Sequence, residues 1–305
     1  MKYSPFFTVV IPTYNRADLL PEAIQSVLNQ TCKDFEIIVV DNFSSDNTTE
    51  VMEAFTKDSR IKYFRNDKNM ERAYSRNVGL RHGEGKFLTL LDSDDIMYPD
   101  CLQDALDYTK SNLEKKVFHN LYEFVDQNGK PTKPVHLPEI RNQYKAICKS
   151  NFLSCIGVFI HAEVYQRFFF TEDLKMIGSE DYEIWFRILG YYEVGRIKKV
   201  NCGIREHLGR SVYSSMYENL GYQKDQIIKL IQKDPILLSR YSKYIGYIHA
   251  NFYFHQAIYN LHKKQKLEAF TQFAKSIIKG KGMLLSKRFP AFIKNFAFSI
   301  FKKFQ

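Results

Sequence analysis

Leu90-Leu91-Asp92-Ser93-Asp94-Asp95 is the stretch that decides the fold, because an apolar run from Phe87 ends there in three carboxylates. In an open α/β sheet, ligands bind beyond the carboxyl ends of the strands. Crowded carboxylates repel one another unless a cation or hydrogen bonds compensate their charge, and Mg²⁺ and Mn²⁺ prefer oxygen ligands. The stretch predicts a divalent-metal site for a phosphorylated ligand. The alternative is an acidic cap, in which Ser93 and Asp94 precede a helix that starts near Pro99.

The sequence before this stretch alternates between apolar strands and amphipathic helices. Strands are expected at 7–11, 35–40, 61–64 and 87–91, and helices at 19–28, from about residue 49, and at 71–82. Asp41 follows the second strand and opens a turn rich in Asn, Ser and Asp. Nearly continuous apolar strands that alternate with helices are typical of a mostly parallel sheet in an α/β fold.

The pattern changes after residue 112. It predicts a helix at 99–112, a hairpin or an excursion that includes 116–126 and the turn at 127–130, a strand at 157–161, a helix at 182–189 and one or two short strands within 194–205. From Asp225 onward the chain is expected to be helical, with a helical hairpin formed by 241–262 and 267–278. We therefore expect an α/β domain at 1–220 and a C-terminal helical region at 221–305.

Composition limits the class of protein. With 305 residues, 45% apolar and 26% charged, the chain can build a sizeable core. Its five cysteines are scattered and odd in number, and none has CxxC spacing, which indicates a reducing cytosol. The N-terminal residues lack the pattern of a signal peptide, and no apolar stretch is long enough to span a bilayer.

The net charge of +10 is concentrated at the C-terminus. Eight of the 44 bases follow Glu268, the last acidic residue, which leaves 36 bases against 34 acids in the rest of the chain. A basic tail indicates an anionic partner, either nucleic acid or a membrane surface. Nucleic acid is disfavoured because the basic excess is confined to the tail.

Six motifs in this order resemble those of the family 2 glycosyltransferases, which have a GT-A fold. They cover roughly residues 7 to 215 and are Val9 to Arg16, Asp41 to Thr48, Ser75 to Gly79, Leu91 to Asp95, Glu180-Asp181, and Arg205-Glu206-His207 with Ser211. One departure from the family pattern is that Asn42 and Phe43 stand where a second acid and a glycine are common. This departure makes the resemblance a weaker guide to which nucleotide base the protein binds.

The resemblance implies a nucleotide site formed by four residues. Asp41 would accept the imide proton of uracil, and Thr13 and Arg76 would contact the nucleotide, with Ser93 near the ribose. From the residues alone, Asp41 is equally well a turn carboxylate that binds the loop backbone. A lone Arg76 on a helix is more often solvated than functional.

The resemblance also implies the reacting groups. Asp92 and Asp94 match the family's Asp-x-Asp motif for Mn²⁺ or Mg²⁺, with His207 as a further metal ligand or diphosphate contact. A lone His at a strand end is more often structural. Asp181 matches the general base that takes the acceptor's proton, and its alternative role is a helix N-cap.

The resemblance implies a metal-dependent, inverting hexosyl- or N-acetylhexosaminyltransferase. It would move a sugar from a nucleoside-diphosphate donor, with UDP favoured, to a glycan or lipid-linked glycan hydroxyl in capsule, O-antigen or other surface polysaccharides. The rivals are a sugar nucleotidyltransferase, which lacks support because no glycine-rich phosphate loop follows the first strand, and a non-catalytic sugar-nucleotide or glycan-binding scaffold.

The C-terminal tail predicts where such an enzyme would lie. One helical face collects apolar residues, and Arg288, Lys294 and Lys302 lie elsewhere on the wheel; the apolar positions are Phe289, Phe292, Ile293, Phe296, Ala297, Ile300 and Phe304. Such a helix can lie in an anionic membrane interface. We therefore expect a cytoplasmic protein, peripheral on the inner face of the cell membrane. The alternative is that these phenylalanines dock onto the protein itself.

Overall fold

The computed structural model describes residues 4–135, 137, 139–206, 218–280, 290, 292–293 and 296. The chain divides into two compact units. The first consists of Met1–Glu139, Leu153–Leu174 and Glu180–Arg210, and the second of Ile140–Phe152, Lys175–Ser179 and Ser211–Gln305. Two short segments from within the expected 1–220 domain, 140–152 and 175–179, are thus grouped with the helical region.

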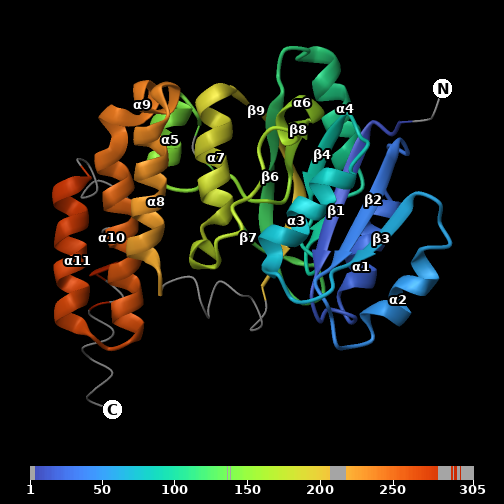
Figure 1. Ribbon diagram of the computed structural model, residues 1–305, viewed down its shortest axis with the longest axis horizontal. Helices are drawn as coiled ribbons and strands as arrows, with labels where there is room; N and C mark the ends of the chain where they lie inside the picture. Colours follow the sequence, from blue (N-terminus) through green and yellow to red (C-terminus); the bar gives the residue numbers. More distant parts are fainter. Residues whose placement is uncertain are drawn as a thin grey trace. The chain divides into compact units, whose positions relative to one another are not determined.

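The first unit is built on a parallel sheet with helical crossovers (Figure 1). Strands β1 (Phe7–Thr13), β2 (Phe35–Asp41), β3 (Ile61–Arg65) and β4 (Phe87–Leu90) pair in the order β3-β2-β1-β4, and every pairing is parallel. Helices α1 (Leu20–Leu28), α2 (Thr48–Phe55) and α3 (Glu71–His82) connect them. All seven residues of β1 and of β2 are buried, and the only charged residues among them are Glu36 and Asp41 of β2.

The sheet continues through strands that pair mainly antiparallel. After β4 come β8 (Val158–His161), β6 (Val117–Val125), β9 (Val194–Arg205) and β5 (Ile96–Met97), while β7 (Pro131–Pro134) pairs with β6. Only β6 and β9 run parallel within this part. The residues expected to give one or two short strands form the single twelve-residue β9. Helices α4 (Cys101–Ser111), α6 (Ala162–Tyr165) and α7 (Glu180–Tyr191) complete this unit.

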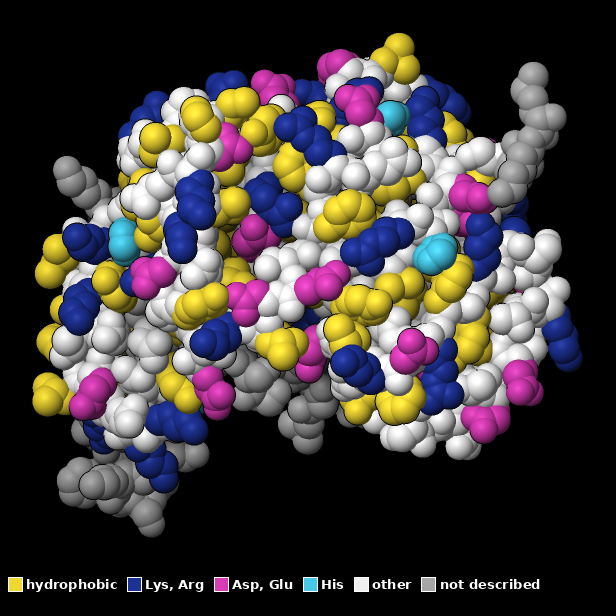
Figure 2. All heavy atoms as spheres, in the orientation of Figure 1, with side chains coloured by type: hydrophobic (Ala, Val, Ile, Leu, Met, Phe, Trp, Pro, Cys, Tyr) yellow, Lys and Arg dark blue, Asp and Glu magenta, His cyan; other side chains and the backbone are white. Residues whose placement is uncertain are grey.

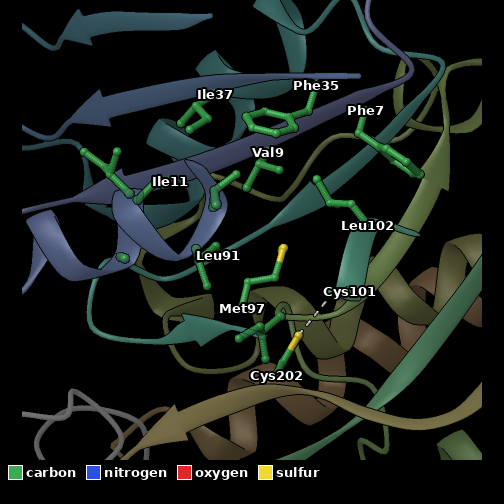
Figure 3. Packing of buried hydrophobic residues seen from close by; sticks show 14 of the residues in the cluster. Phe7, Val9, Ile11, Phe35, Ile37, Leu91, Met97, Cys101, Leu102 and Cys202 are labelled. Carbon is green, nitrogen blue, oxygen red and sulfur yellow. Dashed lines mark hydrogen bonds between the residues drawn. The ribbon is translucent and has the colours of Figure 1, made fainter. Parts of the chain in front are cut away.

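One hydrophobic core holds the sheet to its helices (Figure 3). It includes Phe7, Phe35 and Leu102, and the rings of Phe118 and Phe159 stack with centroids 5.1 Å apart. All five cysteines are free thiols, and all five are buried. On α3, a Cβ added at Gly79 would lie 2.1 Å from Val10 Cγ1, so this glycine lets the helix approach β1 closely.

The second unit consists of helices. They are α5 (Gln143–Lys149), α8 (Leu220–Lys233), α9 (Pro235–Tyr241), α10 (Ile245–His262) and α11 (Lys266–Lys279), and the last two confirm the expected helical hairpin. The buried Gln223 explains why 175–179 belongs here. Its Nε2 donates to the carbonyls of Lys175 at 3.1 Å and Ile177 at 3.0 Å, and its Oε1 accepts from Ser179 Oγ at 2.9 Å.

The basic tail expected at 289–304 lies mostly outside the described residues. Phe292, which is described, is fully buried and stacks on Phe273 of α11 with centroids 3.8 Å apart. The ring centroid of Phe296 lies 5.9 Å from that of Phe292, and Phe296 is half-buried. At these two positions the aromatic rings dock onto the protein's own helices. Among the described residues, every helix is too short or too polar to cross a bilayer.

Candidate functional site

The candidate site lies at the carboxyl edge of the parallel strands. Thr13 ends β1, Asp41 ends β2, and the two residues are direct register partners. Val10 of β1 pairs with Leu90 of β4, so the Asp92–Asp95 stretch leaves the sheet at the same edge. Parallel strands bring these polar residues together because their carboxyl ends share one side of the sheet.

Asp41 is a fully buried carboxylate with three protein partners. Its Oδ1 accepts from the Ser44 amide at 2.8 Å, and its Oδ2 accepts from the Tyr63 hydroxyl at 2.8 Å and lies 3.5 Å from Arg65 Nε. Burial, together with the adjacent Asp41 charge, raises the pKa of Tyr63 to about 12, so its phenol stays a donor. Asp41 therefore does bind the loop backbone. A carboxylate has about four acceptor positions, so a further N–H donor from a nucleotide base is within its capacity.

Thr13 offers an unsatisfied polar atom at this edge. Its Oγ1 is buried and has no hydrogen-bond partner within the described part of the chain. An unmade hydrogen bond in a buried place costs about 1–3 kcal/mol. A ligand hydroxyl or carbonyl bound here would remove that cost.

Arg76 is the central cation of the site. It is 3% exposed, and it donates from Nη1 to Glu180 Oε1 at 3.0 Å and from Nη2 to Asp92 Oδ1 at 3.1 Å. The expectation that a lone helical arginine is solvated is wrong here, because α3 packs this side chain into the protein. Burial disfavours its charge, but Cys155, Asp92 and Glu180 nevertheless raise the pKa of Arg76 well above its ordinary value.

The start of α7 supplies two carboxyl groups beside Arg76. Glu180 is buried, and Asp181 is half-buried with its Oδ1 accepting from the Tyr182 amide at 2.6 Å. Helix α7 begins at Glu180, so Asp181 lies within the first turn and not at the N-cap position. Burial and the charge of Glu180 raise the pKa of Asp181 to about 7, against the opposing influence of Arg76.

The three carboxylates after β4 differ in their surroundings. Asp92 is 40% exposed, Asp94 is 20% exposed with its Oδ2 3.7 Å from Arg16 Nη2, and Asp95 is buried. Helix α4 begins only at Cys101, and its N-cap makes no side-chain cap bond. The acidic-cap alternative for Ser93 and Asp94 is therefore wrong, and Ser93 is buried within the loop.

Arg205, at the end of β9, fixes the backbone of this loop. Its amide donates to Asp95 Oδ1 at 3.0 Å, and its Nε donates to the Asp94 carbonyl at 3.0 Å. Its guanidinium also bonds to the Gln127 carbonyl and pairs with Glu22 at 2.7 Å. The motif that contains Arg205 gives no sign of this role, because all of the partners of Arg205 are distant in the chain.

The described carboxylates are suited to a divalent cation shared with a substrate. Within the described residues, no three His, Cys, Asp or Glu side chains form a metal cluster, and His207 lies outside those residues. Mg²⁺ at phosphate sites is commonly held by one or two carboxylates plus the phosphates themselves. Asp92 and Asp94, both partly exposed oxygen donors, fit that kind of site.

Comparison with known proteins identifies a family and two relatives. Residues 8–169 match the family model described as glycosyl transferase family 2. An uncharacterized glycosyltransferase of Rickettsia felis is 32% identical over 208 residues, which are 68% of this chain and 34% of that protein, so the match spans about a third of the relative's length. The Escherichia coli protein WfgD, named UDP-Glc:alpha-D-GlcNAc-diphosphoundecaprenol beta-1,3-glucosyltransferase, is 31% identical over 196 residues, which are 64% of this chain and 73% of WfgD.

A solved structure shares the fold. The crystal structure of Staphylococcus aureus TarS 1–349 in complex with UDP-GlcNAc superposes with a TM-score of 0.69. The match covers 89% of this chain and 79% of that one at 21% sequence identity. The likeness therefore extends well beyond residues 8–169, over most of the chain.

Proposed function

The chain belongs to glycosyl transferase family 2, and on this premise we propose that it transfers a sugar from a nucleoside-diphosphate donor to a hydroxyl of a cell-surface glycan. The expected family and GT-A fold are confirmed. One observation carries the proposal: a buried arginine links Asp92, at the end of β4, to the start of α7, where Asp181 has a pKa of about 7.

The donor we propose is a UDP-sugar. The carboxylate of Asp41 has acceptor capacity for the imide N–H of uracil, and Thr13 presents a hydroxyl that needs a partner. Ser93 would lie near the ribose, and Arg76 would bind the base or diphosphate. The name of the E. coli relative contains UDP-Glc, and the S. aureus TarS structure is a complex with UDP-GlcNAc, which supports this choice.

We further propose that Asp94 and Asp92 hold Mn²⁺ or Mg²⁺, with His207 as a further candidate ligand. Such a cation would neutralise charge on the departing nucleoside diphosphate. The protein already compensates both carboxylates, through Arg76 at 3.1 Å and Arg16 at 3.7 Å. Arg76 and Arg16 therefore hold the two carboxylates at one edge of the sheet despite their mutual repulsion.

Asp181 is the proposed general base, and the transfer would invert the anomeric carbon. Its carboxylate takes the proton of the acceptor hydroxyl while that oxygen bonds to the anomeric carbon. The bond from this carbon to the diphosphate oxygen breaks on the opposite face, and its electron pair leaves with the nucleoside diphosphate. A pKa of about 7 suits this task, because a general base works best when its pKa lies near the operating pH.

A membrane-bound acceptor agrees with this proposal. The E. coli relative's name contains a diphosphoundecaprenol acceptor, which is a lipid. We place this protein at the cytoplasmic face of the membrane, with a glycan or lipid-linked glycan as acceptor. The basic tail at 289–304 remains a proposed anchor, although Phe292 and Phe296 already pack within the second unit.

The proposal can be tested with the purified full chain. Stabilisation against heat by a panel of sugar nucleotides, with Mn²⁺ present, identifies the donor, and release of UDP from that donor measures catalysis. We expect selective stabilisation by one UDP-sugar and slow donor hydrolysis that Asp181→Asn abolishes. Stabilisation without hydrolysis would favour a binding scaffold, and stabilisation by no sugar nucleotide would overturn the proposal.

A further inference from the structure

Helix α11 is apolar on two opposite sides. One side packs against α10 through Ala269 and Phe273 and is buried in the core of the second unit. On a helical wheel at 100° per residue, Leu267 and Ile278 fall on the opposite side. Phe270 lies between the two sides, about 60° from Phe273, with its ring centroid 6.1 Å from that of Phe296. An ordinary surface helix has a polar outer face, so this arrangement calls for an explanation.

The outward side chains are strongly exposed. Leu267 is 76% exposed, Phe270 is 53% exposed and Ile278 is 73% exposed. With Thr271 and Ala274 between them they form an almost uncharged stripe about 17 Å long. We call this stripe the α11 face. Figure 2 shows yellow side chains protruding at the left-hand edge, where Figure 1 draws α11, with dark blue side chains beside them.

The charge around the α11 face is nearly all positive. The α10–α11 hairpin contains five lysines, no arginine and a single acidic residue, Glu268; the lysines are Lys263, Lys264, Lys266, Lys275 and Lys279. Helix α10, the neighbour of α11, has no acidic residue. On the wheel, Lys275 and Lys279 flank the stripe on one side and Lys266 flanks it on the other. Lysine stems can lie along an apolar surface while their ammonium groups reach outward.

We propose that the α11 face docks on an anionic lipid bilayer. An exposed apolar stripe edged by lysines matches an interface with acyl chains beneath negatively charged headgroups. The surface differs from the expected tail anchor, because it belongs to a helix whose other side is firmly packed. The inference does not depend on the catalytic assignments, since neither Asp181 nor Asp94 takes part.

The charges also argue against a second copy of this chain as the occupant. In a two-fold interface the same surface patch meets itself. Four or five lysines would then face the same lysines, with only Glu268 on each side to compensate. Like charges brought together at an interface are unfavourable. An anionic bilayer instead places negatively charged headgroups opposite the lysines while its acyl chains contact the apolar stripe.

A single labelled position tests the contact without altering the apolar side chains. Because the five native cysteines are buried, a cysteine introduced at exposed Thr271 is the preferred site for an environment-sensitive fluorophore. The matched control is Gln232→Cys, an exposed position on α8. With vesicles of phosphatidylcholine and phosphatidylglycerol, we expect a blue shift of the fluorophore's emission when it is attached at position 271 and no shift when it is attached at position 232. Equal shifts at both positions, or no shift at either, would overturn the proposal.

Two sets of variants separate the apolar and charged contributions in vesicle co-sedimentation of the full chain. Replacing Leu267, Phe270 and Ile278 by Ser should weaken binding about 100-fold, from partial burial of three apolar side chains. Lys275→Gln with Lys279→Gln should weaken binding about 25-fold, and added salt should act similarly.

The control for co-sedimentation is Ile236→Ser with Leu238→Ser, which removes exposed apolar groups from α9 and should leave binding unchanged. Unchanged binding of the α11 triple variant would contradict the proposal. So would equal affinity for vesicles of phosphatidylcholine alone. A dimer in sedimentation velocity that the triple variant converts to monomer would assign the α11 face to self-association instead. Donor hydrolysis in detergent-free buffer should be the same for all variants, which keeps this test separate from the catalytic proposal.

Discussion

Removing the charge of Arg76 should destabilise the protein strongly and in a way that depends on Glu180. The two side chains are 3% and 5% exposed and 3.0 Å apart. Deleting one partner of a buried ion pair typically costs about 3–5 kcal/mol, because the other charge stays buried without compensation. We therefore expect Arg76→Met to lower the free energy of unfolding by about 3–5 kcal/mol, close to half the stability of many domains.

The same substitution should be partly rescued by a second one. In Arg76→Met with Glu180→Gln the buried charge is gone, so the combined loss should be smaller than that of Arg76→Met alone by about 1–3 kcal/mol. Arg76→Lys keeps the charge, but a lysine cannot bridge Glu180 and Asp92 with the same planar fork, so we expect an intermediate loss. A matched surface control is Lys110→Met, whose partner Asp107 is 57% exposed, with an expected loss below about 1 kcal/mol.

Urea unfolding followed by circular dichroism measures these differences directly. A loss for Arg76→Met no larger than that for Lys110→Met would refute the role of the buried ion pair, and so would losses from Arg76→Met and Glu180→Gln that simply add. Arg76→Met should also change the kinetics. Because Arg76 opposes the rise in the pKa of Asp181, Arg76→Met should move the lower limb of the pH–rate profile to higher pH. An unmoved profile would mean that Arg76 does not influence the base.

Three further predictions follow from the site. Asp181→Asn should keep UDP binding but reduce transfer by roughly 10²–10⁴-fold. The folded-state pKa of Asp181 is raised from 3.8 to about 7, so the charge of Asp181 destabilises the fold as pH rises through that window. Urea midpoints should therefore show that the variant gains more stability over the native protein at pH 8 than at pH 4. Asp94→Asn should abolish transfer and weaken Mn²⁺-dependent UDP binding by about 2–5 kcal/mol in calorimetry, and full transfer activity in EDTA would refute the metal role. Arg205→Met should still fold in the absence of UDP, but its turnover should fall because the backbone at Asp94 and Asp95 is displaced. An unchanged metal affinity would contradict this positioning role.

The sequence was sufficient for the elements of the parallel sheet. Strands such as Phe7–Thr13 and Phe35–Asp41 are buried along their whole length, so their apolar runs are unambiguous. Helix α5 was not predicted, although Asn142 caps it through a bond from the Lys145 amide at 2.8 Å. It is only seven residues long, and a pattern that short carries little periodicity.

The environment of the site residues was harder to predict than their identity. Arg76 and Glu180 are 104 residues apart in the chain, and nothing local to either one shows that they pair. The three carboxylates from Asp92 to Asp95 look equivalent in the sequence, yet Asp95 is buried against Arg205 while Asp92 is partly exposed. Sequence spacing gives residue types and faces, whereas burial depends on contacts between distant segments.

The composition of the second unit has a consequence for synthesis. Helix α5 packs against α9 and α10, whose residues lie some ninety positions later in the chain. At ribosomal speeds of about 5–20 residues per second, α5 leaves the exit tunnel about 5–20 s before its partners exist. During that interval Ile147 and Cys148, which are buried in the finished protein, face solvent. The interval therefore makes α5 a segment on which a nascent-chain chaperone would act.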